Sequence, residues 1–320
     1  MTAAAQTGMT VVTGRRRAAK PGNRPSQWWI WLFLVPTVVL YGVFTLYPII
    51  ASYWYSLLDW NGFDTRVTFI GLQNFGAVLH DPLFWNSFRI TAIFTAVTVP
   101  LRVLLGLGLA LLLNHPKMPW KRLFRAAFFL PVVATTAIIG IVMQFIFDPA
   151  SGPINQGLER LGLLHQGIDF LGSPSSALYT VMGVYTWKWL GITMIYWLAA
   201  LQTIPPDIGE AARVDGASSW QALRRITLPL LKPFLVIITL LTLVDTLQVF
   251  DLVLGMTAGG PQYHTEVLEL YIYRYAFGSS IPQLGYASAA AVLFGLIAAV
   301  LGALQVLGVR MARRGSAATA

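Results

Sequence analysis

The stretch WWIWLFLVPTVVLYGVFTLYPIIASYWYSL, residues 28–57, decides the fold class of this chain, and it contains no charged residue. A bilayer core about 30 Å thick needs roughly 20 consecutive apolar residues in a helix, so the stretch is long enough to span. A cleaved signal peptide is the alternative, but its apolar core would cover only about 7–15 residues and end at a small-residue cleavage site. We therefore interpret residues 28–57 as an uncleaved membrane span.

Five further apolar stretches follow, at residues 90–113, 126–147, 177–204, 234–256 and 284–309. All six should be helical, because an open strand edge cannot be satisfied in lipid. The composition agrees: 56% of the chain is hydrophobic and 11% is charged, whereas soluble domains carry about 25% charged residues. The sequence predicts an all-α integral membrane domain of six transmembrane helices over residues 28–309. A disordered tail is expected over residues 1–27 and a second tail over 310–320.

The basic residues indicate how the chain is oriented. Sixteen Lys and Arg residues fall in the two tails and in the loops after the second and fourth stretches, against four on the opposite side. Cytoplasmic loops carry the excess of Lys and Arg in membrane proteins, so both termini are predicted to be cytoplasmic. The net charge of +9 then reflects topology, and we expect no nucleic-acid partner.

Several kinds of chemistry are not supported by the sequence. The chain has no cysteine, which excludes disulfides and thiolate sites, and its four histidines show no metal-ligand spacing. No G-x-x-x-x-G-K-[ST] motif occurs, so ATP would have to be bound by another subunit. We expect no bound cofactor, no metal and no catalysis. A membrane enzyme would need a nucleophile–base constellation, and none stands out.

The loop over residues 205–232 is long, polar and patterned, beginning PPDIGEAARVDGASSWQALRR. Pro205-Pro206-Asp207 predicts a helix start, and Gly216 permits the left-handed turn that ends it. A second helix should begin at Ser218 or Ser219 and stop before Pro229. This helix–turn–helix could press its small side chains into a partner protein, or rest as an amphipathic helix on lipid headgroups.

The same loop resembles the EAA loop of bacterial ABC-importer permeases, through Glu210-Ala211-Ala212, Asp215-Gly216-Ala217 and Ile226-x-Leu228-Pro229. The resemblance extends to the sugar-importer branch, the carbohydrate permeases similar to the larger maltose-importer subunit. The motifs that carry it lie at residues 70–75, 81–85, 200–205, 250–252 and 257–261. The chain lacks the extra N-terminal spans and large outer domain of that subunit, so the resemblance does not cover how a binding protein docks.

The resemblance implies a type I importer permease bundle in a bacterial cytoplasmic membrane, importing a sugar. It implies four kinds of partner: a second, different permease, two cytoplasmic ABC ATPase subunits, an external solute-binding protein, and the sugar itself. ATP and Mg would be bound by the ATPase subunits. The implied ATPase-coupling residues are Glu210, Ala211, Ala212, Arg213, Asp215 and Gly216.

Charged residues within the predicted spans indicate a solute pathway or helix pairing, because each costs at least about 2.5–3.5 kcal/mol to insert. Asp245, Gln248 and Asp251 recur at intervals of three and should share one broad helix face. Hydrogen-bonding groups and aromatic faces suit a sugar. The candidate pathway residues are Asp245, Gln248, Asp251, Trp187, Trp189, Tyr196 and Arg102.

Other interpretations stay open at this point. Arg102 could simply pair with Asp245 or Asp251, and Lys188 with its neighbouring tryptophans could form an interfacial belt with a snorkelling cation. The solute could be glycerol phosphate or another polyol-like compound, although a phosphate would want several cations. A proton-coupled secondary transporter using Asp245 and Asp251 is the remote alternative, but the sequence shows no convincing internal repeat.

Overall fold

The computed structural model describes residues 27–115, 118–278 and 281–317, with side chains described up to residue 303. The predicted tail over residues 1–27 therefore lies outside the described part, except for Gln27. The chain divides into two units, Met1–Ala51 and Ser52–Ala320, and each is described by itself.

The first predicted span is one uninterrupted helical stretch. It consists of α1 (Gln27–Tyr41), a π-helical turn η1 (Gly42–Leu46) and α2 (Tyr47–Tyr55), whose end reaches into the second unit. Pro48 has no N–H to donate, and the wider π-turn just before it is a common way for a helix to accommodate such a residue. Residues 31–55 are long and apolar enough to cross a membrane.

In the second unit, α4 (Pro82–Asn114) and α8 (Ala177–Leu201) pack against each other along the buried core. Glycine allows their close approach, since a Cβ on Gly106 would lie 2.9 Å from the side chain of Thr193. The second helix starts earlier than predicted because Asp81 caps it, accepting a hydrogen bond of 2.8 Å from the Leu83 N–H, with Pro82 at its first position.

The third span is not the single helix that the sequence predicted over residues 126–147. It consists of α5 (Lys121–Val133) and α6 (Thr136–Ile146), which are bent by 99°. Ala134 and Thr135 between them have extended backbone. Hydropathy does not detect such a break, because no charged residue interrupts the chain from Ala126 through the connection to the end of α6.

The predicted stop at Pro229 is wrong. Helix α10 (Ser219–Ala222), the π-helical turn η2 (Leu223–Thr227) and α11 (Leu228–Thr246) form one continuous helix over residues 219–246. The π-turn directly precedes Pro229, where a regular helix would lose a hydrogen bond. The fifth span is instead interrupted later, between Thr246 and α12 (Phe250–Met256).

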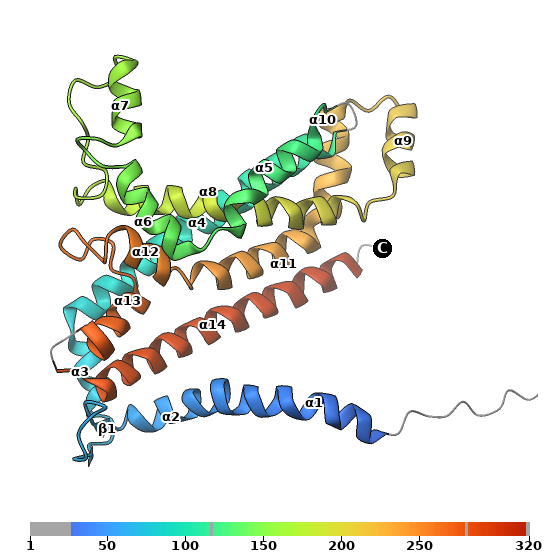
Figure 1. Cartoon of the computed structure of the whole chain (residues 1–320). Coiled ribbons are helices and arrows are strands. Elements are labelled where there is room, and N and C mark those ends of the chain that lie inside the picture. The colour runs from blue at the N-terminus through green and yellow to red at the C-terminus, as the bar shows by residue number, and fades with distance from the viewer. Residues whose placement is uncertain (1–26, 116–117, 279–280, 318–320) are drawn as a thin grey trace, which may run out of the picture. The chain divides into compact units, whose positions relative to one another are not determined.

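The last span is α14 (Leu284–Ala317), which contacts α11, α3 and α13. The shorter elements lie between the spans: β1 (Leu58–Asp59) paired antiparallel with β2 (Thr68–Phe69), α3 (Gln73–His80), α7 (Pro153–Arg160), α9 (Pro206–Val214), α13 (Leu268–Tyr273) and η3 (Arg274–Gly278). Figure 1 shows α7 and α9 at opposite ends of α8.

Among the described residues, four helices are long and apolar enough to span a membrane, and the bent α5–α6 pair makes a fifth. The remaining predicted span, over residues 177–204, corresponds to α8. Its 25 residues would extend about 37 Å at 1.5 Å per residue, enough to cross the core. Lys188 and several Trp and Tyr residues lower its hydropathy. The all-α membrane architecture is confirmed.

Candidate functional site

The segment from α9 to α10, called the elbow from here on, has the predicted helix–turn–helix form. Gly216 has a φ of 79°, the left-handed conformation that glycine adopts without strain. Ser218 then caps α10 reciprocally with Gln221: the Ser218 N–H donates to Gln221 Oε1 at 2.8 Å, and the Gln221 N–H donates to Ser218 Oγ at 3.3 Å. Local capping therefore sets the angle between the two helices.

The elbow presents its predicted coupling residues to the outside. Ala212 is buried, whereas Glu210, Ala211, Arg213, Asp215 and Gly216 are exposed. Glu210 and Arg213 form an exposed ion pair at 3.8 Å, which contributes little to stability.

Two large apolar side chains accompany these residues, Val214 at 87% exposure and Trp220 at 66%. Trp220 was not predicted as a surface feature, although a tryptophan at the start of a polar helix is a visible signal. An exposed mixture of apolar and charged side chains on a short, rigid segment is suited to contact a partner.

Inside the bundle, Arg102 forms an ion pair with Asp245, one of the two partners that the helix-pairing interpretation allowed. Arg102 Nη1 lies 2.8 Å from Asp245 Oδ2, with exposures of 1% and 35%. The guanidinium also donates to Thr246 Oγ1 at 3.4 Å and to Thr193 Oγ1 at 3.3 Å. Tyr185 Oη donates to the Asp245 carbonyl at 2.7 Å. These contacts join α4, α8 and α11, and Thr193, Thr246 and Tyr185 were not predicted.

Lys188 is buried and does not snorkel to an interface. Its side chain is 1% exposed. Lys188 Nζ donates to the Ala134 carbonyl at 2.9 Å and lies 3.4 Å from the Pro131 carbonyl. The ammonium also sits 4.3 Å from the centroid of the partly buried Trp189 ring. The interpretation of Lys188 as a snorkelling cation is therefore wrong.

Asp245, Gln248 and Asp251 do not share one helix face. Asp245 lies near the end of α11, Gln248 falls in the interruption and Asp251 begins α12. The helical spacing that grouped them does not continue across the break. Gln248 and Asp251 are exposed, and Asp245 is partly exposed, so all three remain accessible to a solute or a partner helix.

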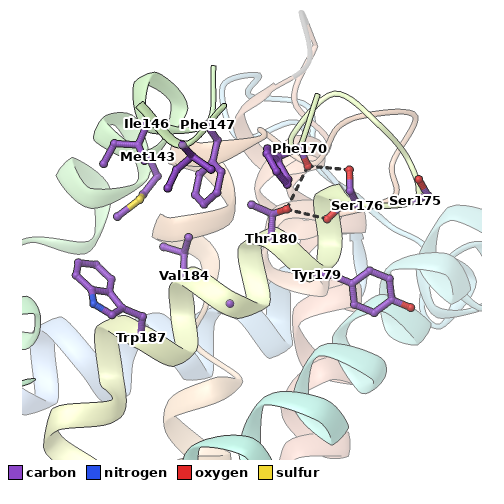
Figure 2. A pocket seen from close by; sticks show the side chains of 12 residues that line it. Met143, Ile146, Phe147, Phe170, Ser175, Ser176, Tyr179, Thr180, Val184 and Trp187 are labelled. Carbon is purple, nitrogen blue, oxygen red and sulfur yellow. Dashed lines mark hydrogen bonds between the residues drawn. The ribbon is translucent and has the colours of Figure 1, made fainter. Parts of the chain in front are cut away.

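Trp187 faces a different part of the structure. It lines a cavity of about 620 Å³ together with residues of α6 and the loop before α8. Figure 2 shows Val184 and Trp187 across this cavity from Met143 and Ile146. Tyr185, which contacts Asp245, is two residues away and so points to nearly the opposite side of α8. Tyr196, on the next turns of the same helix, is 36% exposed. The predicted pathway residues thus fall into separate groups.

Among the carboxylates outside the spans with shifted pKa values are Glu269 and Asp81. Burial raises the pKa of Glu269 on α13 to about 7, the Phe250 N–H lowers it, and the charge of Asp251 raises it. Burial alone would raise the pKa of Asp81, but its hydrogen bonds, the strongest of them from Tyr271, outweigh burial and lower this pKa. Neither environment could be predicted from the sequence. Within the described residues, no group of three or more acidic or histidine side chains could hold a metal ion.

The fold and these sites define a multi-pass α-helical membrane protein with a patterned surface elbow between two spans. Residues 102–313 match the model of the binding-protein-dependent transport system inner membrane component family, and the chain belongs to that family. It is a permease component of a transport system.

Similar proteins cover most of the chain. It is 37% identical to the lactose transport system permease protein LacF of Rhizobium radiobacter, over 88% of this chain and 93% of the relative. It is 34% identical to the probable starch degradation products permease AmyD of Thermoanaerobacterium thermosulfurigenes, over 87% and 92%. A chain of a bacterial ABC transporter that imports the acidic polysaccharide alginate shares the fold, with a TM-score of 0.76 and 23% identity over 89% and 96% of the two chains.

Proposed function

We propose that this chain is one permease subunit of an ATP-driven importer that receives a sugar from a solute-binding protein. The observation that carries the proposal is the 37% identity, over 88% of the chain, to a permease named for lactose transport. A second relative at 34% identity, from Thermococcus litoralis, is named for trehalose and maltose. These solutes are neutral sugars with many hydroxyl groups, and the chain forms half of the pathway for a compound of this class.

The proposal places the protein in a bacterial cytoplasmic membrane with both termini inside. The excess of Lys and Arg in alternate loops supports this orientation. The elbow then lies on the cytoplasmic side, and α3, α7 and α13 lie outside. ATP and Mg are bound by two partner ATPase subunits, and this chain forms and breaks no covalent bond.

The elbow is the proposed contact with an ATPase subunit. Glu210, Ala211, Ala212, Arg213, Asp215 and Gly216 form this site. Their exposure and the left-handed turn at Gly216 support it. Because the capped turn holds α9 and α10 at a fixed angle, movement of an ATPase can be transmitted to α8 and α11, the helices on either side.

Asp245, Gln248 and Asp251 are the proposed polar contacts for solute, and Trp187 and Tyr196 are proposed aromatic contacts. Arg102 acts behind Asp245 by orienting its carboxylate. Both Arg102 and Lys188 are buried and already hydrogen-bonded. They are therefore poor ligands for a phosphate, which favours a neutral sugar over glycerol phosphate.

Reconstitution of the complete transporter in nanodiscs tests the function. The cognate binding protein is first screened against a sugar panel by thermal shift, including phosphorylated polyols. ATPase activity is then measured with each stabilising ligand. We expect a neutral sugar to stimulate ATPase activity in the presence of the binding protein. Stimulation by a phosphorylated polyol alone, or by no compound in the panel, would contradict the proposal.

A further inference from the structure

Within the described residues two spans are interrupted, and each interruption has an ionisable partner from another helix. The third span breaks between α5 and α6, and the fifth breaks between α11 and α12. Lipid offers no hydrogen-bond partners to the backbone groups that a break in a span frees, so other protein groups must satisfy them. The residues that satisfy them determine how firmly each break is held.

Lys188 of α8 satisfies the first break. Its ammonium donates to the carbonyl of Ala134, which lies in the break, and reaches the carbonyl of Pro131 in the last turn of α5. A cation is favoured beside the free carbonyls at the C-terminal end of a helix. Because the side chain is only 1% exposed, solvent cannot replace it.

Glu269 of α13 satisfies the second break with a hydrogen-bond acceptor. Its Oε2 accepts a hydrogen bond of 2.8 Å from the N–H of Phe250, the first residue of α12. Glu269 is partly buried. One break is therefore held through its carbonyl groups by a cation, and the other through an N–H group by a carboxyl oxygen.

The segments beyond the two breaks pack on each other. Helices α6 and α12 are in contact, and a Cβ on Gly140 would lie 2.9 Å from Gly255 Cα, so the backbones meet directly. Gln144 Nε2 of α6 also donates to the Gly255 carbonyl at 2.8 Å. We call these two helices the α6–α12 pair. Its connections to the rest of both spans are the two breaks.

We infer that Lys188 and Glu269 are positioning residues that together fix the α6–α12 pair against the inner halves of its two spans. The inference rests on the proposed transport function. Both contacts exist in the conformation described here, so removing either one destabilises this conformation relative to others. The population then shifts toward states that normally require the solute-loaded binding protein.

The test uses the complete transporter in nanodiscs and compares ATPase activity without and with the loaded binding protein. Lys188→Met and Glu269→Leu remove the hydrogen-bonding group, whereas Lys188→Gln and Glu269→Gln keep a neutral one. We expect unstimulated activity to rise about three- to tenfold in Lys188→Met and Glu269→Leu, and less in the Gln variants, because only the former lose the contact that favours the resting state. The exposed Lys121→Met and Glu159→Gln serve as charge-matched controls.

The double variant Lys188→Met/Glu269→Leu tests whether the two residues act on one body. If they hold the same pair of helices, the unstimulated ATPase activity of the double variant should rise little beyond that of the more active single variant. If the two contacts are independent, the fold-increases of the single variants should multiply. If Lys188→Met does not assemble, the two Glu269 variants decide the question alone.

Failure of the inference can be separated from failure of the proposed function. Absence of sugar-dependent stimulation in the unmodified transporter would overturn the function. Normal stimulation in the unmodified transporter, with unchanged unstimulated activity in the variants, would overturn the role of Lys188 and Glu269. If the fold-increases in unstimulated ATPase activity multiply in the double variant, the claim that both residues hold the same α6–α12 pair would be overturned.

Discussion

The elbow and the Arg102 cluster are built in opposite ways. The capping contacts of Ser218 and the Glu210–Arg213 pair join residues three apart on an exposed surface. Arg102 instead reaches Asp245, 143 positions away, from a fully buried site. The elbow can therefore take its shape from its own sequence, whereas the cluster exists only when three spans are assembled. Substitutions in the elbow should alter function with little loss of stability, whereas substitutions in the cluster should lower stability most.

Arg102→Met should have the largest effect on stability. It leaves the Asp245 carboxylate without its partner among α4, α8 and α11. Because this carboxylate is 35% exposed, we expect a loss of about 2–3 kcal/mol, below the roughly 3–5 kcal/mol for a fully buried pair. Thermal unfolding of the purified complex in detergent would measure the loss. The double variant Arg102→Met/Asp245→Leu is the control, and it should recover most of the stability because no charge is left unpaired. If Arg102→Met were as stable as the unmodified protein, the proposed difference between the elbow and the Arg102 cluster would be wrong.

The same contrast explains which features the sequence could predict. The elbow was predicted in detail because proline, glycine and serine determine the backbone conformation of residues close to them in the sequence. The predicted helix end at Pro229 was wrong, because the π-turn before it allows the helix to continue. The partner of Arg102 stayed ambiguous between Asp245 and Asp251, since only the assembled bundle selects one. The breaks at Ala134 and after Thr246 were missed, because the hydropathy of a broken span equals that of a straight one.

Glu269 tests an intermediate case, because its contact with Phe250 joins residues 19 apart. Its pKa rises from 4.5 to about 7 on folding, mainly through burial, while the Phe250 N–H lowers it and the charge of Asp251 adds to the rise. The folded chain thus holds this proton more tightly than the unfolded chain. The stabilisation is complete below pH 4.5 and is lost as the pH rises through about 7.

Thermal unfolding across this pH range measures the effect of Glu269. After allowing for partial exposure, we expect a loss of about 2 kcal/mol between the two ends of the range. Glu269→Gln stays neutral and should remove this dependence, whereas the exposed Glu159→Gln should keep it. An unchanged pH profile in Glu269→Gln would show that another group is responsible.

Gly216→Val would introduce about 1–2 kcal/mol of strain if the turn kept its conformation, because a side chain at a φ of 79° is strained in the left-handed region. The strain is local and nothing lies within 4 Å of a Cβ at this position, so the cost should appear as a changed angle between α9 and α10. We expect nearly normal thermal stability together with a loss of most sugar-stimulated ATPase activity. Gly209→Ala, at an open position within α9, is the matched control. A large drop in the unfolding temperature would show that the elbow is tied to the core.

Glu210→Ala should have the smallest effect on stability and is the sharpest test of the comparison. Its ion pair with Arg213 is long, at 3.8 Å, and both side chains are more than two-thirds exposed. The free energy of unfolding should therefore change by less than about 0.5 kcal/mol. If the elbow contacts an ATPase, the same variant should still reduce sugar-stimulated ATPase activity, because a charge at a protein interface affects association even where it adds nothing to folding. Glu159→Ala, equally exposed but on α7, should leave the stimulated activity unchanged. Stability and coupling would then separate at one residue, which is possible only if the surface of the elbow, and not its fold, is what the partner binds.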